Sequence, residues 1–305
     1  MISQPQSKAA RLAQLIQTGV LAPGCYDALT AALVEEAGFQ AAYLTGGSIA
    51  YSKLGRPDVG LVGASEVAET IAHIADRVEL PLIVDADTGF GNALNVWRTV
   101  RQFERAGASA IQIEDQQSPK RCGHLSGKTL ISTEEMVGKI KAAVDTRERA
   151  LIVARTDAIA VEGLDQALDR ADAYVEAGVD ILFVEALPSQ SAMREACSRF
   201  GSSVPMIANM VEGGTTPVLD SSTLFDLGFR IVIFPGAMAR TLVFAARQML
   251  SVLKRDGTTE ANWHNMVDIH GINEVVGASE LLEMGRLYSE RIAAFGIEHG
   301  DAERT

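Results

Sequence analysis

The chain contains few of the residues and segments that mark secreted or membrane proteins. Only 3 of its 305 residues are cysteine (Cys25, Cys122 and Cys197), and their spacing shows no pairing pattern. A disulfide-stabilised fold is therefore not expected, whereas a reducing, cytoplasmic location is. No apolar run approaches the roughly 20 residues of a membrane-spanning helix, and residues 1–11 lack the apolar core of a secretion signal. We expect no membrane partner.

The sequence is also short of positive charge. Lys and Arg together number 27 against 39 Asp and Glu, which gives a formal net charge of −12. This acidity argues against nucleic acid as a partner. It does not exclude a small anionic substrate, because a local cluster of Arg, Lys and metal can outweigh the overall field. Hydrophobic residues make up 47% of the chain and charged residues 22%, which is typical of a globular protein.

Eight short apolar runs recur along the chain. They are residues 20–23, 41–44, 82–84, 110–113, 151–154, 181–184, 206–208 and 231–234. Each run is too short and too uniformly apolar for a half-exposed antiparallel strand, and the pattern is typical of strands that are buried on both faces. The segments between the runs are amphipathic and predict helices, for example at residues 64–77, 94–106, 133–144, 164–177 and 221–227.

Eight such units predict a (β/α)8 (TIM) barrel, with one extra N-terminal helix at residues 8–18. The alternative is a doubly wound open sheet, which usually carries a glycine-rich nucleotide loop after its first strand. Residues 22–27 lack that fingerprint. We therefore expect one barrel domain over residues 1–305, in which residues 237–305 form a helical tail. Within this tail we expect helices at residues 237–253, 272–284 and 287–295. Because this tail is longer than one closing helix requires, we expect it to pack on a neighbouring subunit.

Acidic residues follow the third and fourth apolar runs, and barrel enzymes act at the C-terminal ends of their strands. Asp85 and Asp87 lie two residues apart, so their carboxylates point to the same side and can share one hard cation or its bound waters. The alternative is a helix cap beside a solvated acid, but Glu114 after the next run favours the metal. Mg²⁺ takes only one or two direct carboxylates, so not all three acids need to contact it.

Two further strand ends carry groups suited to anions. Residues 45–48 read Thr-Gly-Gly-Ser, in which glycines let backbone N–H groups approach an anion. The alternative is an ordinary turn. Arg155 follows the fifth run and is the natural two-point partner of a substrate carboxylate. The alternative role for Arg155 is an internal ion pair with Asp157 or Glu185.

Cys122 lies in the charged loop Lys120-Arg121-Cys122-Gly123-His124. Nearby cations stabilise a thiolate over a thiol, so this cysteine could give or take a proton near neutral pH. The alternative for any cysteine is a small buried hydrophobic residue, which we expect for Cys197 on a helix. His124 could be the partner of Cys122, a supporting hydrogen-bonding group or a loop histidine without a role.

Together these residues resemble the isocitrate lyase and phosphoenolpyruvate mutase superfamily, and the match runs from residue 23 to residue 235. The loop at residues 120–125 looks like the signature of its lyase branch. The resemblance implies a (β/α)8 barrel whose last helix is exchanged between subunits of a homotetramer. It also implies Mg²⁺, with Mn²⁺ as a substitute, and a small anionic dicarboxylate as the substrate.

The resemblance assigns roles to individual residues. Asp87 is the direct metal ligand, Asp85 and Glu114 act through water, and Cys122 is the general acid. By resemblance, His124 orients substrate or water. Apart from the resemblance, Lys120 is a further catalytic candidate, and Tyr43 is a candidate base acting through water. The residues that bind or orient substrate are Thr45, Gly46, Gly47, Asp58, Gly123, Arg155, Glu185 and Asn209.

Departures from the resemblance narrow the expected function. Methylisocitrate lyases usually have Ser in place of Thr45 and Arg in place of Leu125. Isocitrate lyases carry long insertions that are absent here. Phosphoenolpyruvate mutases lack the cysteine that corresponds to Cys122. The remaining match is to the group of 2,3-dimethylmalate lyases, oxaloacetate hydrolases and carboxyphosphonoenolpyruvate mutases.

We expect a Mg²⁺-dependent carbon–carbon lyase that cleaves a 2-hydroxy di- or tricarboxylate of 2-alkylmalate or methylisocitrate type. The products would be a 2-oxo acid and a second carboxylate. The alternatives are a phosphonomutase, an oxaloacetate hydrolase and a non-catalytic dicarboxylate-binding protein.

Overall fold

The computed structural model describes residues 6–123 and 127–294 of the chain. It contains two compact units, Met1–Phe244 and Ala245–Thr305. The first unit holds the barrel and the second holds most of the helical tail. Within the described ranges, no helix is both long enough and apolar enough to cross a membrane.

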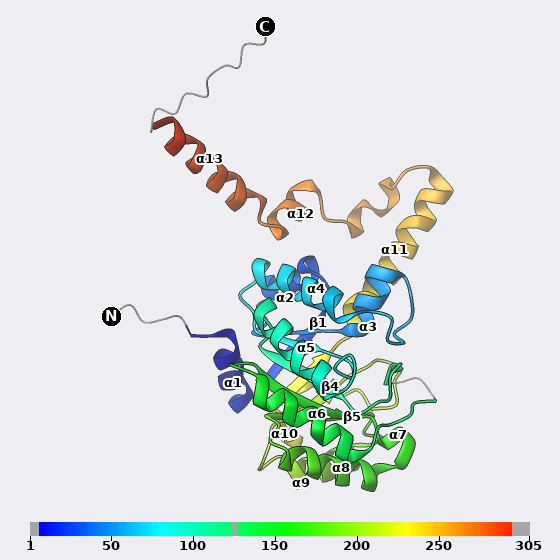
Figure 1. The fold of residues 1–305 in the computed structure, drawn as a ribbon. Coiled ribbons are helices and arrows are strands. Elements are labelled where there is room, and N and C mark those ends of the chain that lie inside the picture. Colours follow the sequence, from blue (N-terminus) through cyan, green and yellow to red (C-terminus); the bar gives the residue numbers. More distant parts are fainter. Residues whose placement is uncertain (1–5, 124–126, 295–305) are drawn as a thin grey trace. The chain divides into compact units, whose positions relative to one another are not determined.

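The first unit is a closed barrel of parallel strands, in which each strand pairs with the next in sequence and the eighth pairs with the first (Figure 1). The strands are β1 (Val20–Cys25), β2 (Ala42–Leu44), β3 (Leu82–Asp85), β4 (Ala110–Glu114), β5 (Leu151–Thr156), β6 (Ile181–Val184), β7 (Met206–Asn209) and β8 (Ile231–Phe234). All eight predicted runs are strands, and the predicted (β/α)8 architecture is confirmed.

Helices surround the barrel on its outside (Figure 1). They are α1 (Lys8–Thr18), α2 (Ala28–Glu36), α3 (Gly46–Ile49), the π-helix η1 (Ala50–Leu54), α4 (Ala64–Arg77), α5 (Ala93–Ala106), α6 (Thr133–Thr146), α7 (Ile159–Glu162), α8 (Leu164–Glu176), α9 (Gln190–Phe200) and α10 (Ser221–Leu227). The predicted helices agree with these to within two residues at each end. Gly107 and Gly228 end α5 and α10 in the left-handed region, at φ 116° and 115°, where only glycine fits easily.

Side chains from the strands fill the barrel interior. The cluster of fully or nearly fully buried residues includes Ile83, Phe183 and Ile231, and Leu12 and Ile16 of α1 belong to it as well. The extra N-terminal helix therefore covers the end of the barrel where the strands begin. The opposite end, where the strands finish, is left for polar residues.

The strands end in the polar residues that the sequence singled out. Asp85, Glu114 and Asn209 are the last residues of β3, β4 and β7. The ladder pairs Asp85 with Gln112, and Glu114 with Arg155. Because these residues belong to strands rather than loops, the pleat of the barrel fixes the direction of each side chain.

The tail begins with α11 (Ala237–Asp256) and continues through the 3-10 helix η2 (Glu260–Asn265), α12 (Ile269–Val275) and α13 (Ala278–Ala294). The sequence predicted helices at residues 272–284 and 287–295 instead. The structure differs because Gly277, at φ 72°, ends α12, whereas Gly285 continues the helix. Phe295 lies outside the described residues.

Candidate active site

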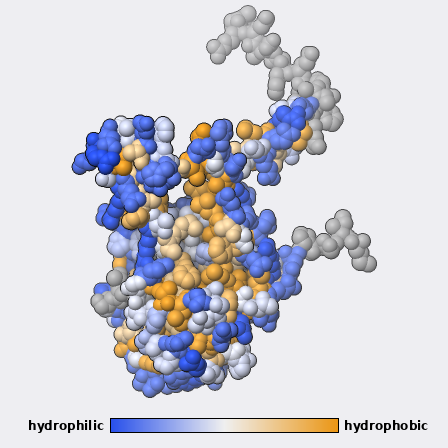
Figure 2. Space-filling model, turned by 180° about the vertical axis from the view of Figure 1, so that it is seen from behind, coloured by the Kyte–Doolittle hydropathy of each residue, from blue (hydrophilic) through white to orange (hydrophobic). Residues whose placement is uncertain are grey.

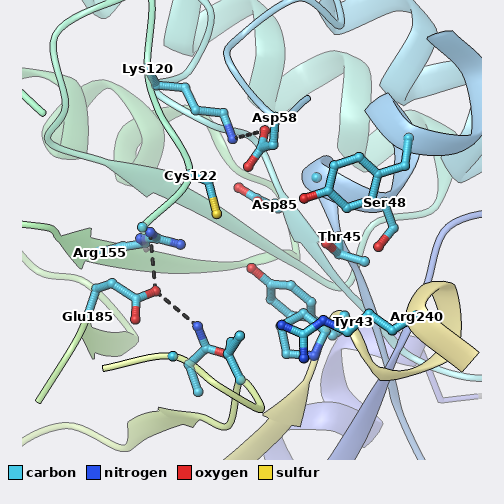
Figure 3. Close-up of a pocket in the computed structure, with 18 of the residues that line it drawn as sticks. Tyr43, Thr45, Ser48, Asp58, Asp85, Lys120, Cys122, Arg155, Glu185 and Arg240 are labelled. Atoms are coloured by element: carbon cyan, nitrogen blue, oxygen red, sulfur yellow. Dashed lines mark hydrogen bonds and ion pairs between the residues drawn. The ribbon is translucent and has the colours of Figure 1, made fainter. Parts of the chain in front are cut away.

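A cavity of about 190 Å³ is lined by residues from the C-terminal ends of the strands and the loops that follow them. Most of the predicted site residues line it: Tyr43, Thr45, Gly47, Asp58, Asp85, Lys120, Cys122, Gly123, Arg155, Glu185 and Asn209. Figure 3 shows labelled side chains such as Tyr43, Cys122 and Arg155 pointing into the cavity from different strands and loops. The structure thus brings together residues that lie up to 166 positions apart, from Tyr43 to Asn209.

Three other predicted residues lie just behind the lining. A Cβ at Gly46 would be 3.2 Å from Oδ1 of Asp87, so this glycine makes room for the carboxylate. Asp87 pairs with Lys120 at 2.7 Å, and Glu114 lies 3.3 Å from Nε of Arg155. His124, the remaining predicted residue, lies outside the described part of the chain, as does Leu125.

Asp87 is held in an unfavourable position. Its φ of 48° lies in the left-handed region, which a non-glycine residue adopts at a cost, and such strain is common at functional sites. Burial raises the pKa of Asp87 to about 7 against the opposing effect of Lys120, and Asp85 and Asp58 raise it further. The nearby lysine is therefore not enough to offset the burial of this carboxylate.

Lys120 is the cation within this acidic group. Its Nζ lies 2.5 Å from Oδ1 of Asp58 and 2.7 Å from Oδ1 of Asp87. Burial lowers the pKa of Lys120, but Asp87, Glu114, Asp85 and Asp58 together raise it well above its usual value. The lysine is therefore charged. It contacts Asp58 and Asp87, and the charges of Asp85 and Glu114 also act on it.

The acidic residues fit a hard divalent cation. Within residues 6–123 and 127–294, no three Asp, Glu, His or Cys side chains lie close enough to hold one ion together. However, Oε1 of Glu114 is buried without a hydrogen-bond donor from the described residues, and burial raises the pKa of Glu114 well above its usual value. Mg²⁺ needs only one or two direct carboxylates and completes its shell with water. That Asp87, Asp85 and Glu114 bind a metal ion stays a prediction.

Arg155 anchors the opposite wall of the cavity. Its Nε and Nη2 donate to the two oxygens of Asp157 at 2.9 and 3.0 Å, and Nη2 lies 3.2 Å from Oε2 of Glu185. Asn209 donates to that same Glu185 oxygen at 3.0 Å. The sequence left open whether Arg155 faces substrate or forms internal pairs. The structure shows the internal pairs and also places Arg155 on the cavity wall.

Tyr43 lies at the bottom of the cavity. Its hydroxyl donates to Oε1 of Gln112 at 3.0 Å, and Nε2 of Gln112 donates to Asp85 at 3.3 Å. Burial and the charge of Asp85 raise the pKa of Tyr43 well above its usual value. The phenol is therefore uncharged, which favours a hydrogen-bond donor over the proton acceptor that the sequence suggested.

The sulfur of Cys122 points into the cavity between Arg155 and Asp85 (Figure 3). The thiol is half-buried, and the backbone N–H of Cys122 donates to the carbonyl of Asp58 at 3.1 Å. Gln116 fixes the loop from the other side, because its amide exchanges hydrogen bonds with the backbone of Arg121 at 2.8 and 2.9 Å. The loop is thus fixed at its base by hydrogen bonds.

The other two cysteines have surroundings that suppress reactivity. Burial, with the charge of Asp27, raises the pKa of Cys25 to about 12, and burial raises that of Cys197 to about 11. All three cysteines lie in the described part of the chain, and none forms a disulfide.

The cavity also includes residues that sequence reasoning did not single out. Tyr51 enters from η1, and Arg240 enters from the start of α11, where it pairs with Glu212 at 2.7 Å. The sequence could have indicated these residues through their positions after the strands. Gly213 and Gly236 follow the ends of β7 and β8, so the loops that carry these residues and their neighbours had to meet at the same end of the barrel.

A closed parallel barrel whose strand ends and following loops gather carboxylates, an arginine and a half-buried cysteine around one cavity has the layout of a barrel enzyme. A family model described as phosphoenolpyruvate phosphomutase matches residues 12–254. The 2,3-dimethylmalate lyase of Eubacterium barkeri is 44% identical over 287 residues, which covers 92% of this chain and 98% of that protein.

A 2-methylisocitrate lyase of Aeropyrum pernix is 52% identical over 239 residues, which covers 78% of this chain and 77% of that protein. A solved structure of oxaloacetate acetylhydrolase with the inhibitor 3,3-difluorooxalacetate has a TM-score of 0.88 at 32% identity, and covers 93% of this chain and 97% of that one. The chain belongs to the phosphoenolpyruvate mutase and isocitrate lyase superfamily. The predicted enzyme class, a lyase, is confirmed.

Proposed function

We propose that the chain cleaves a 2-hydroxy di- or tricarboxylate of the 2-alkylmalate or methylisocitrate type between C2 and C3. The observation that carries this proposal is the placement of the Cys122 sulfur and the Arg155 guanidinium on one cavity, beside a group of buried carboxylates. A carboxylate recognised by arginine and a proton donor within the same cavity are what such a cleavage requires.

Two arginines on the cavity wall suit a substrate with more than one carboxylate. Arg155 and Arg240 both line the cavity, and they come from different elements, β5 and α11. Arg155 binds the carboxylate next to the reacting carbon, and Arg240 binds the second one. Thr45 adds a hydroxyl at the N-terminus of α3, where backbone N–H groups are also available to an anion.

The bond that breaks joins C2 and C3 of the substrate. The 2-hydroxyl gives its proton to water in the cavity, and C2 becomes the carbonyl carbon of the 2-oxo acid. The electron pair of the broken bond stays on C3 as an enolate conjugated with its carboxylate. Cys122 gives its thiol proton to C3, and the second carboxylate product leaves.

Asp87, with Asp85 and Glu114 behind it, would hold Mg²⁺ or Mn²⁺, which would supply positive charge to the oxygens of C1 and C2. The chain's own residues orient the substrate around this charge. Tyr43 supports Asp85 through Gln112. Lys120 keeps the loop that carries Cys122 attached to Asp58 and Asp87.

The test is a substrate screen that detects 2-oxo acids. The purified protein is incubated with Mg²⁺ and, separately, 2,3-dimethylmalate, 2-methylisocitrate, oxaloacetate or phosphonopyruvate. We expect pyruvate from one of the first two substrates. Turnover of oxaloacetate alone would support a hydrolase, and rearrangement of the phosphonate alone would support a phosphonomutase. Either result would contradict the proposal.

We also propose that the helical tail packs on another copy of the chain, in a homotetramer. None of the 20 residues of α11, all of which the structure describes, is buried. Figure 2 shows hydrophobic residues gathered on one face of the molecule. Exposed apolar areas of this kind mark interaction sites. The large apolar side chains exposed in the second unit include Leu250, Trp263, Ile269, Leu281, Leu282, Leu287 and Tyr288.

A further inference from the structure

Lys128 is a buried lysine that the proposed reaction does not use. Its side chain is only 2% exposed, and its Nζ lies 3.2 Å from Oδ1 of Asp157. The same ammonium donates to the backbone carbonyl of Gly123, the residue after Cys122. Among the described residues, Lys128 is not one of those that line the cavity. A buried ammonium is costly unless it is paired, so these contacts must account for its position.

Gly123 lies against the pair formed by Arg155 and Glu185. A Cβ at this position would be 2.5 Å from Nη2 of Arg155 and 3.1 Å from the carboxyl carbon of Glu185. Only glycine can approach the pair so closely. The backbone of Gly123 therefore rests on the substrate-facing arginine, while its carbonyl oxygen meets Lys128.

Asp157 gives Lys128 a fixed anchor. Both carboxylate oxygens of Asp157 accept from Arg155, at 2.9 and 3.0 Å. The backbone N–H of Asp157 donates to Asp115 at 2.9 Å. Since Asp157 is buried, Lys128 connects the loop carbonyl to a residue that is held both at its carboxylate and at its backbone.

We propose that Lys128 is a positioning residue that holds the Cys122–Gly123 turn against Arg155, so that the thiol faces the carbon next to the carboxylate that Arg155 binds. This inference rests on the proposed role of Cys122 as proton donor. Its physical basis is that the rate of proton transfer falls steeply when the donor and the acceptor are misplaced, even by about 1 Å.

The first test compares Lys128→Met with Lys128→Arg on the substrate that the screen identifies. Methionine keeps the length of the side chain but cannot donate, and arginine restores a charged donor. We expect kcat to fall on the order of 10²-fold for Lys128→Met, with KM changed less, and to recover in part for Lys128→Arg. Wild-type kcat in Lys128→Met would overturn the proposal.

A double variant separates positioning from a general loss of structure. If Lys128 acts through the thiol, Lys128→Met should lower kcat much less in a Cys122→Ser background than in the wild type. If the two losses simply multiply, Lys128 acts independently of Cys122 and the proposal fails. If Cys122→Ser alone keeps wild-type kcat, the proposed function of the cysteine fails instead, so the two failures are distinguishable.

A labelling experiment remains informative if turnover is too low to measure. In a Cys25→Ser/Cys197→Ser background, Lys128→Met should change the rate at which iodoacetamide alkylates Cys122 several-fold, and Lys128→Arg should return it toward the starting value. The matched control is Lys139→Met, which removes a buried ammonium that donates to the carbonyl of Thr88 at 3.2 Å. An equal change in the control, or none in Lys128→Met, would overturn the proposal.

Discussion

Nζ of Lys120 lies 2.7 Å from Oδ1 of Asp87, so the carboxylate predicted to bind the metal directly already contacts the loop that carries Cys122. A cation at Asp87 would compete with this ammonium, because two positive charges next to each other repel. Asp58, 2.5 Å from the same nitrogen, offers the lysine a second carboxylate. The predicted metal ligand and the loop are therefore coupled through one side chain.

Asp87→Asn should remove most turnover. The amide keeps the shape of the side chain but lacks the charge that a divalent cation requires. Since a bound cation typically supplies several kcal/mol of charge stabilisation, we expect kcat to fall on the order of 10³-fold. The measurement is 2-oxo acid release in excess chelator and after addition of Mg²⁺ or Mn²⁺. Asp145→Asn, an exposed site on α6, is the control. Full wild-type activity in excess chelator would contradict the metal requirement.

Cys122→Ser should lower kcat by about 10²–10⁴-fold, the usual contribution of general acid–base catalysis. A hydroxyl has nearly the shape of a thiol but is a far weaker acid, so substrate affinity should change little. Steady-state kinetics on the substrate from the screen would give both values. Cys25→Ser and Cys197→Ser are the controls, with kcat within a few-fold of the wild type. A Cys122→Ser enzyme with normal kcat would remove the proton-donor role.

The three thiols should differ in their reaction with iodoacetamide at pH 8. Burial raises the pKa of Cys25 to about 12 and that of Cys197 to about 11, so both thiols remain protonated at this pH. Only the thiolate reacts at an appreciable rate. We therefore expect label on Cys122 well before the other two, measured by mass spectrometry of the native protein's peptides. Comparable labelling of Cys25 in the folded protein would show that its buried position is wrong.

The sequence was sufficient to predict the barrel because parallel strands buried on both faces leave a clear pattern. The run at residues 82–84 is uniformly apolar and is followed at once by Asp85. The run at residues 110–113 is apolar apart from Gln112 and is followed at once by Glu114. The tail was harder. Gly277 ends a helix and Gly285 does not, and the residues around each glycine do not distinguish the two cases.

Site residues could be predicted from the sequence where they lie at the C-terminal end of a strand, because the strand itself places them at the mouth of the barrel. Asp85, Arg155 and Asn209 are of this kind. The pairing of Lys128 with Asp157 and that of Arg240 with Glu212 could not be predicted. The partners are 29 and 28 residues apart, and nothing local to either residue indicates them. Such contacts follow from the closure of the barrel rather than from any motif.

The helical tail provides the last prediction. Leu282 on α13 is 75% exposed within a single chain, so Leu282→Glu should have little effect on an isolated molecule. If the tail packs on a neighbouring copy, the same change buries a charge at the interface and should weaken the assembly. We expect a tetramer for the wild type and a smaller species for Leu282→Glu by light scattering. Ser279→Glu, an exposed polar site on the same helix, is the matched control. A monomeric wild type at working concentration would contradict the proposed assembly.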